Sequence, residues 1–279
     1  LGCLADKGKA FLESHQISGK ECCIGISCGG PLDSGRGVIL SPPNLPGWDQ
    51  VPIVSYLEQR LDMDARLKND ADACALAEWR YGAGRGCRHM IFLTFGTGLG
   101  AGLVLNGRLY EGACGMAGEA GHVRLAEEGP VGYEKAGSFE GFCSGGGIAR
   151  LARSMAEDAL KAGRPVSYMK EGGLDDITAR DVAEAAEMGC ADAGEVLAVS
   201  GRYFGRGLAM LVDILNPERI VAGGIYARAG RFLKDEMEKE LRREALPASV
   251  NACCILPCGL GEQIGDYGAV MAALEMWEE

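Results

Sequence analysis

A run of seven residues, Gly96 to Gly102, contains four glycines and a hydroxyl at Thr97, and it follows a strand-like segment at 89–95. Glycine lacks a side chain, so backbone N–H groups in such a run can approach an anion closely. The segment after it, 103–105, also resembles a strand and leads to an Asn106-Gly107 hairpin signal, whereas the glycine fingerprint of dinucleotide folds opens a helix. The pattern predicts a phosphate-binding turn on a β-hairpin, with a ligand-free glycine turn as the alternative.

Polar side chains flank this run at positions where strands end or glycines cluster. Asn69 and Asp70 end a short strand and precede a helix expected over 72–81. Farther along, Glu119 and His122 lie in Gly-Glu-Ala-Gly-His, and Glu140 lies in a second glycine-containing segment. Such positions commonly hold the groups that perform chemistry. The alternatives are structural roles. Asp70 would be a helix N-cap, a role that the sequence also permits for Asp72. Glu119 and Glu140 would be surface acids, and His122 a buried histidine.

Together with other motifs in order along the chain, these residues resemble the ROK family of repressors, open reading frames and kinases, in the actin and hexokinase superfamily. The resemblance covers nearly the whole chain. The further motifs are Ile24-Gly25-Ile26 to Gly30-Pro31, Asn44-Leu45-Pro46-Gly47-Trp48, Asn216-Pro217 to Gly223-Gly224, and Ile264-Gly265 to Gly268-Ala269.

The resemblance implies an α/β protein with the two-lobed actin-like, ribonuclease H-like ATPase fold and a cleft between its lobes. We expect an N-terminal lobe of residues 1–86 plus 265–279, incomplete at its start, and a C-terminal lobe of residues 87–264. The boundary is placed at the small-residue break Gly82 to Gly86, where such residues interrupt regular structure.

Strands and helices alternate along the chain and would position the polar groups. Expected strands are 22–27, 66–68, 219–222 and 253–256, and expected helices are 5–14, 51–61, 146–162, 194–215, 227–244 and 266–277. Asp49 is a plausible cap for the helix at 51–61.

By the resemblance, Asp70 matches the family's catalytic aspartate. Phosphoryl transfer to a hydroxyl requires an acceptor for the hydroxyl proton and a positioned phosphate, and a carboxylate supplies the first. Carboxylates and imidazoles also suit the adjacent hydroxyls of a sugar. The expected hexose-binding residues are Gly30, Asn44, Asn69, Glu119, His122 and Glu140.

The resemblance also implies ATP as cofactor, with Mg²⁺ held mostly by phosphate oxygens and water. The expected nucleotide-binding residues are Gly96, Thr97, Gly98, Gly100, Gly223 and Gly224. The glycine pair at 223–224 would lie under the adenosine, and a helix-entry turn is the alternative there.

Two departures from the family pattern stand out. Most members carry a cysteine loop that binds a structural zinc, but the matching positions here are Val131, Tyr133 and Ser138, so we expect no zinc. We expect packing by Tyr133, Phe139 and Phe142 to hold this loop. The family's first phosphate loop, Asp-x-Gly-Gly-Thr, has no counterpart before Cys22; either the chain is a piece of a longer protein or the resemblance is incomplete there.

Composition narrows the classes of partner. The chain has 279 residues, 47% of them hydrophobic, and a net charge of -11, which would repel a nucleic-acid backbone. No apolar stretch approaches the ~18 residues of a membrane span. The 12 cysteines show no zinc-hairpin spacing and several lie in apolar segments. They are expected to be reduced thiols of a cytoplasmic protein. The expected oligomeric state is a homodimer.

The sequence therefore predicts an ATP-dependent hexose kinase with Asp70 as the general base. Glucose, fructose and the N-acetylhexosamines remain open as substrates. One alternative is a sugar-sensing repressor of the same family, whose DNA-binding module would precede Leu1. Another is a sugar-binding protein without turnover.

Overall fold

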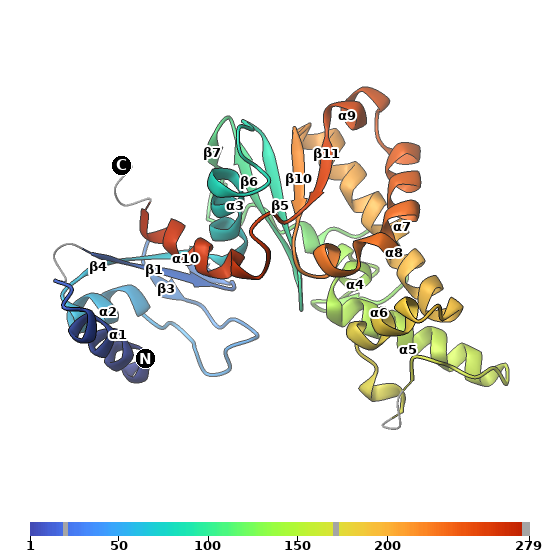
Figure 1. Ribbon diagram of the computed structural model, residues 1–279, viewed down its shortest axis with the longest axis horizontal. Coiled ribbons are helices and arrows are strands. Elements are labelled where there is room, and N and C mark those ends of the chain that lie inside the picture. The colour runs from blue at the N-terminus through green and yellow to red at the C-terminus, as the bar shows by residue number, and fades with distance from the viewer. Residues whose placement is uncertain (19–21, 170–172, 275–279) are drawn as a thin grey trace.

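The computed structural model describes residues 1–18, 22–169 and 173–274, which form two α/β lobes (Figure 1). The N-terminal lobe lies at the left of Figure 1 and the C-terminal lobe at the right. None of the helices in the described ranges is long and apolar enough to cross a membrane. All 12 cysteines are free thiols in this structure.

The N-terminal lobe is built around two parallel strands, β1 (Cys23–Cys28) and β4 (Asp64–Asn69). Helices α1 (Gly2–His15) and α2 (Ile53–Leu61) cover one face, and α10 (Ile264–Leu274) covers the other (Figure 1). The fit against α10 is close because a Cβ at Gly25 would come within 1.8 Å of the Ala269 carbonyl oxygen. The chain thus returns from the C-terminal lobe to complete the N-terminal one.

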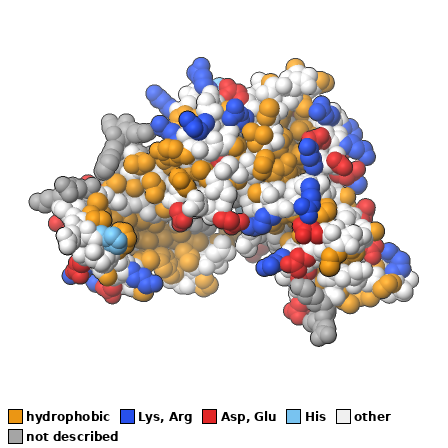
Figure 2. All heavy atoms as spheres, in the orientation of Figure 1, with side chains coloured by type: hydrophobic (Ala, Val, Ile, Leu, Met, Phe, Trp, Pro, Cys, Tyr) orange, Lys and Arg blue, Asp and Glu red, His pale blue; other side chains and the backbone are white. Residues whose placement is uncertain are grey.

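Strand β1 has no partner on its second edge among the described residues. Beside it lies an apolar hollow of about 700 Å³, which includes Phe11, Ile26 and Trp48. Figure 2 shows hydrophobic side chains gathered in this lobe. A short hairpin, β2 (Leu32–Asp33) and β3 (Val38–Ile39), contributes Leu32 and Ile39 to the core of this lobe.

The beginning of α2 differs from the expectation. Asp49 does not cap this helix: Pro52 occupies the N-cap position, and no side chain caps it. Asp49 instead accepts a hydrogen bond from Ser41 Oγ at 2.7 Å, within the loop that carries Asn44. The Asp49 carboxylate therefore bonds within the loop and does not cap α2.

A five-stranded sheet, in the order β11-β10-β5-β6-β7, forms the centre of the C-terminal lobe. Its strands are β5 (Met90–Phe95), β6 (Leu99–Leu105), β7 (Arg108–Leu109), β10 (Arg219–Ala222) and β11 (Cys254–Pro257). β11, β10 and β5 are parallel, whereas β5, β6 and β7 are antiparallel. The β6–β7 turn is Asn106-Gly107, and both residues have positive φ, as a two-residue hairpin requires.

The glycine run is shorter as a turn than the sequence suggested. Only residues 96–98 connect the strands, because Leu99 already belongs to β6 and Gly100 pairs with Thr94. Gly102 lies in β6 where the backbone of a helix comes close to the strand: a Cβ there would come within 2.4 Å of the Ala71 carbonyl oxygen. Glycine at this strand position lets helix α3 (Asp70–Tyr81) pack directly on the sheet.

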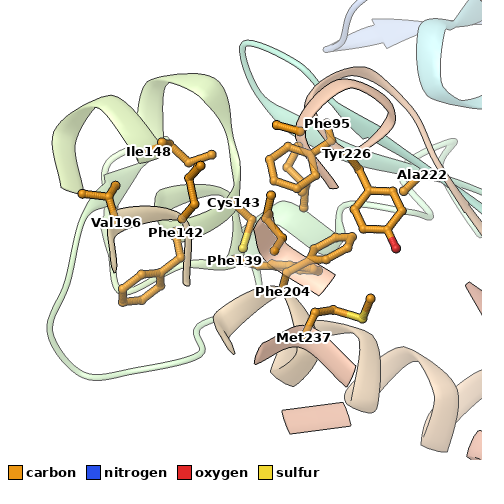
Figure 3. Close-up of a cluster of buried hydrophobic side chains, with 14 of the residues drawn as sticks. Phe95, Phe139, Phe142, Cys143, Ile148, Val196, Phe204, Ala222, Tyr226 and Met237 are labelled. Carbon is orange, nitrogen blue, oxygen red and sulfur yellow. The ribbon is translucent and has the colours of Figure 1, made fainter. Parts of the chain in front are cut away.

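Helices surround the other side of the C-terminal sheet. They are α4 (Phe139–Cys143), α5 (Gly145–Lys161), α6 (Ala179–Glu187), α7 (Ala191–Leu215), α8 (Gly224–Glu244) and α9 (Pro247–Ala252). The helices predicted at 146–162, 194–215, 227–244 and 266–277 are present, with described ends that differ by at most three residues. Residues 275–277 of the last one lie outside the described residues. Phe204 of α7 packs against Phe95 and Tyr226, with ring centroids 5.2 and 5.4 Å apart (Figure 3).

Candidate active site

A cleft of about 780 Å³ is lined by segments of both lobes. It brings together most of the residues that the sequence singled out. These are Gly30, Asn44, Asn69, Asp70, Gly96, Thr97, Gly98, Gly100, Glu119, His122 and Glu140. Gly223 and Gly224 are not on its wall.

Asp70 is the first residue of α3, immediately after β4. Asn69, and not Asp72, is the N-cap: its Oδ1 accepts a hydrogen bond from the Ala71 N–H at 2.9 Å. The Asp70 side chain is therefore not used for capping, and Asp70 lines the cleft. Desolvation by the surrounding protein raises the pKa of Asp70, while hydrogen bonds from the backbone N–H groups of Ala71 and Asp70 act in the opposite direction.

The loop after β1 lies beside this helix start. A Cβ on Gly29 would be 3.8 Å from Asp70 Oδ2, and one on Gly30 would be 3.3 Å from Asn69 Nδ2. The backbone of both glycines can therefore approach the Asn69-Asp70 pair closely. Asn44 reaches the same cleft from the loop before α2.

The turn between β5 and β6 forms another part of the wall. Thr97 is exposed at its tip, and the Gly96 N–H donates to the Gly98 carbonyl at 3.1 Å. Behind it, Thr94 Oγ1 accepts a hydrogen bond from the Gly100 N–H at 2.8 Å. A compact turn with little side-chain cover can present its backbone to an anion.

Glu119 and His122 are positioned by the short 3₁₀ turn η2 (Ala120–His122). The flanking glycines allow this turn to lie against β6, because a Cβ on Gly118 or Gly121 would come within 2.0 Å of a β6 carbonyl oxygen. Glu119 Oε2 and His122 Nε2 are 4.0 Å apart, and both side chains are partly exposed. The pair can offer hydrogen bonds to neighbouring hydroxyls of one ligand.

A hairpin of β8 (Val131–Gly132) and β9 (Lys135–Ala136) supports His122. The Tyr133 ring meets the imidazole edge-on, with centroids 4.7 Å apart, and Lys135 Nζ donates to the His122 carbonyl at 2.7 Å. Ser138, buried at the end of the hairpin, caps α4 by accepting the Gly141 N–H at 3.0 Å. Residues at or beside the family's zinc positions thus hold the loop through packing and hydrogen bonds.

Glu140 lies between the η2 segment and the start of β6. Its Oε2 accepts a hydrogen bond from the Leu99 N–H at 3.0 Å, at the start of β6. Glycine at position 98 leaves room for this contact, since a Cβ there would be 2.8 Å from the same oxygen and the Glu140 carboxylate would have to shift. The sequence expected Glu140 to bind a sugar; in the structure, one of its oxygens accepts a hydrogen bond from the first residue of β6.

Gly223 and Gly224 form the entry to α8, which is the alternative that the sequence left open. Gly224 has a positive φ, and a Cβ there would be 2.0 Å from the Phe95 carbonyl oxygen. The pair therefore packs behind the turn between β5 and β6. Tyr133 and Arg150 also line the cleft, although the expected site contained neither. Tyr133 was considered only as packing, and Arg150 follows a Ser-Gly-Gly-Gly helix start that could have drawn attention to it.

These features define a two-lobed α/β protein of the actin and hexokinase superfamily, with a carboxylate and a glycine turn in one cleft. The ROK family model matches residues 4–276, and the chain belongs to the ROK family.

Among known proteins, the glucokinase of Halalkalibacterium halodurans is 35% identical over 269 residues, which cover 95% of this chain and 80% of that one. The crystal structure of a ROK family glucokinase from Streptomyces griseus, in complex with glucose and AMPPNP, superposes with a TM-score of 0.79 at 30% identity, covering 98% of this chain and 88% of that chain. The xylose repressor of Caldicellulosiruptor bescii is 29% identical over 226 residues, covering 81% of this chain and 55% of that protein.

Proposed function

We propose that this protein, a carbohydrate kinase of the ROK family, transfers the γ-phosphoryl group of ATP to a hydroxyl of a hexose. The observation that carries the proposal is the composition of the cleft. The Asp70 carboxylate, the turn around Thr97 and the Glu119–His122 pair line the same cavity. Such a transfer requires a proton acceptor, hydrogen-bond donors for the phosphates, and groups that bind the sugar hydroxyls.

In this mechanism Asp70 accepts the proton of the attacking hydroxyl. The hydroxyl oxygen bonds to the γ-phosphorus, the bond from that phosphorus to the bridging oxygen breaks, and ADP leaves. Backbone N–H groups of the turn around Thr97 bind the phosphates. Glu119 and His122, with Asn44, Asn69 and Gly30, hold the sugar so that one hydroxyl points toward Asp70.

Glu140 and the pair Gly223-Gly224 assist the binding of the sugar and of ATP. Glu140 contributes to the sugar site and, through Leu99, orients the phosphate turn. Gly223 and Gly224 lie behind that turn, on the side where we place the adenosine. We propose lobe boundaries at 1–86 plus 265–279 and at 87–264, and a cytoplasmic homodimer as the working form.

Mg²⁺ fits the oxygen-rich chemistry of the cleft, where the carboxylates of Asp70, Glu119 and Glu140 face the cavity. We propose that it enters with ATP, because phosphate oxygens and water are ligands that it prefers. When bound, it would neutralise charge on the phosphates. Asp70 is the described residue that we expect nearest to it.

A panel assay tests the proposed function. The full protein is incubated with ATP, Mg²⁺ and glucose, fructose, mannose, N-acetylglucosamine or N-acetylmannosamine, and sugar-dependent ADP release is measured. We expect release well above the sugar-free rate with at least one hexose. Hexose binding without ADP release would contradict the kinase proposal.

That last outcome would favour the second candidate, a sugar-sensing repressor, for which the similarity to the xylose repressor of C. bescii is the supporting observation. A repressor would need the sugar-binding residues of the cleft but no proton acceptor. Binding of DNA by the full gene product, released by a sugar, would then be the positive test.

A further inference from the structure

Arg150 is a charged residue of the cleft that the mechanism above does not use. It lies on α5, is exposed, and lines the cavity together with Thr97 and Gly98. A Cβ built on Gly146 would be 3.3 Å from Arg150 Nη1 and 3.6 Å from the Thr97 carbonyl oxygen. The guanidinium group therefore lies beside the turn that we expect to bind phosphate.

The beginning of α5 is attached to this turn. The Gly145 N–H donates to the Gly96 carbonyl at 2.7 Å, and Ser144 caps the helix by accepting the Gly147 N–H at 2.9 Å. Glycine at position 147 is required, because a Cβ there would come within 2.1 Å of the Gly141 carbonyl oxygen. Arg150, a little over one turn into the helix, is thus carried at a fixed distance from the phosphate turn.

The side chains that line the cleft carry more negative than positive charge, and Arg150 is a positive one. Among the described residues that line the cavity it is the only arginine or lysine, whereas Asp70, Glu119 and Glu140 are carboxylates. A polyanionic triphosphate entering between these carboxylates would be repelled unless a cation faces it. No hydrogen bond or ion pair joins the Arg150 side chain to another described residue. Its fork of N–H donors is suited to bind phosphate oxygens in pairs.

We propose that Arg150 binds the phosphates of the nucleotide and supplies the fixed positive charge on the C-terminal side of the cleft. This inference rests on the proposed function, since it takes ATP and ADP as ligands. Because both nucleotides carry phosphates next to the turn, Arg150 contributes to the binding of both. Adenosine and the hexose gain nothing from it.

The test compares Arg150→Gln and Arg150→Lys with the parent protein. Lys161→Gln is the matched control, since it removes one positive charge from the exposed far end of the same helix. Calorimetry gives the Kd of ADP and of glucose or the best hexose, competition gives that of adenosine, and steady-state assays give KM for ATP. We expect Arg150→Gln to raise the ADP Kd and the ATP KM about tenfold or more, the scale of one charge-assisted hydrogen bond.

Further readouts separate a phosphate contact from a structural one. Arg150→Lys should recover part of the ADP affinity, and the ADP affinity of the parent should fall more steeply with salt than that of Arg150→Gln. Adenosine affinity, hexose affinity and Tm should match those of the control. An unchanged ADP Kd in Arg150→Gln, or an equal loss of adenosine and ADP affinity, would overturn the inference while leaving the kinase proposal intact. A parent protein that binds hexose but no nucleotide would overturn both.

Discussion

The Glu78 carboxylate accepts a hydrogen bond from the Cys258 thiol, with Oε1 and Sγ 2.9 Å apart, and so joins helix α3 to the segment that leaves β11. Glu78 is fully buried and also accepts backbone N–H bonds from Ala83, Gly259 and Leu260, at 2.7, 3.1 and 2.9 Å. These donors belong to the chain segments that cross between the lobes. The buried Glu78 side chain thus holds together the segment after α3 and the segment after β11.

We expect Glu78→Gln to destabilise the protein by about 1–3 kcal/mol, because an amide nitrogen would replace one acceptor oxygen and leave buried N–H donors unpaired. Denaturant unfolding measures the change. Glu238→Gln is the control: its carboxylate is exposed and pairs with Lys234 at 3.7 Å, so its removal should cost little. Equal midpoints for the two variants would show that the Glu78 network contributes no more than a surface pair.

Asp70→Asn should remove nearly all turnover while the hexose Kd stays within a few-fold of the parent. The amide keeps the size of the side chain but cannot take up the hydroxyl proton, so the loss falls on the transition state. Asp64→Asn, at the other end of β4 and exposed, is the control that should retain full activity. Single-turnover kinetics and calorimetry separate the two effects; near-parental kcat in Asp70→Asn would exclude it as the base.

The same variant should not lower Tm. Desolvation raises the pKa of Asp70, so in the folded protein the ionised carboxylate is less favourable than in the unfolded chain. Above the unfolded-state pKa this ionised group opposes folding, and an uncharged amide removes that cost. Thermal melts at neutral pH should therefore place Asp70→Asn at or above the parent, and a clearly lower Tm would contradict the stated environment.

The raised pKa also sets the acid side of the pH profile. The base must be ionised, so kcat/KM should fall as pH drops through the Asp70 pKa, with a midpoint above the ordinary aspartate value of 3.8. Rates of the parent measured from about pH 3 to pH 8, on either side of a typical carboxyl pKa, reveal this limb. Binding of the hexose, measured in parallel, should persist below the midpoint. Constant kcat/KM down to the point of acid unfolding would argue against a carboxylate base with a raised pKa.

The purified protein should contain no stoichiometric zinc, and chelators should leave its Tm unchanged. Tyr133 and Lys135 contact His122 directly, and Ser138 bonds within the same loop, so side chains supply the support that a metal would give. Elemental analysis after purification without added metal measures the content. About one zinc per chain, lost with a fall in Tm on chelation, would contradict this account of the loop.

Gly102→Ala should reduce both stability and turnover. Its Cβ would meet the Ala71 carbonyl oxygen, so α3 and the Asp70 at its start must shift, at an expected cost of roughly 1–3 kcal/mol. Gly194→Ala is the matched control within α7: no atom lies within 4 Å of its added Cβ, and helix propensity predicts a neutral or slightly stabilising change. Parental activity in Gly102→Ala would show that α3 need not pack this closely.

The sequence by itself predicted the motifs and most of the elements, because those signals are local. β10 lies at 219–222 as expected, and Asn106-Gly107 closes the predicted hairpin, since strand patterning and turn chemistry depend on neighbouring residues. Gathering the motifs into one site rested on the family resemblance. The predicted roles of Asp70, Glu119 and His122 await the experiments above.

Tertiary structure alone decided how those residues meet. Gly100 and Gly102 belong to β6 because they pair with Thr94 and Phe92 of β5, and Gly102 also leaves room for α3. Gly224 packs behind the turn between β5 and β6 because the Phe95 carbonyl lies against it. Arg150 reaches the cleft because α5 begins at a hydrogen bond to Gly96, a residue far from it in sequence. Such contacts join distant segments through backbone proximity, a property that no local pattern of residue types encodes.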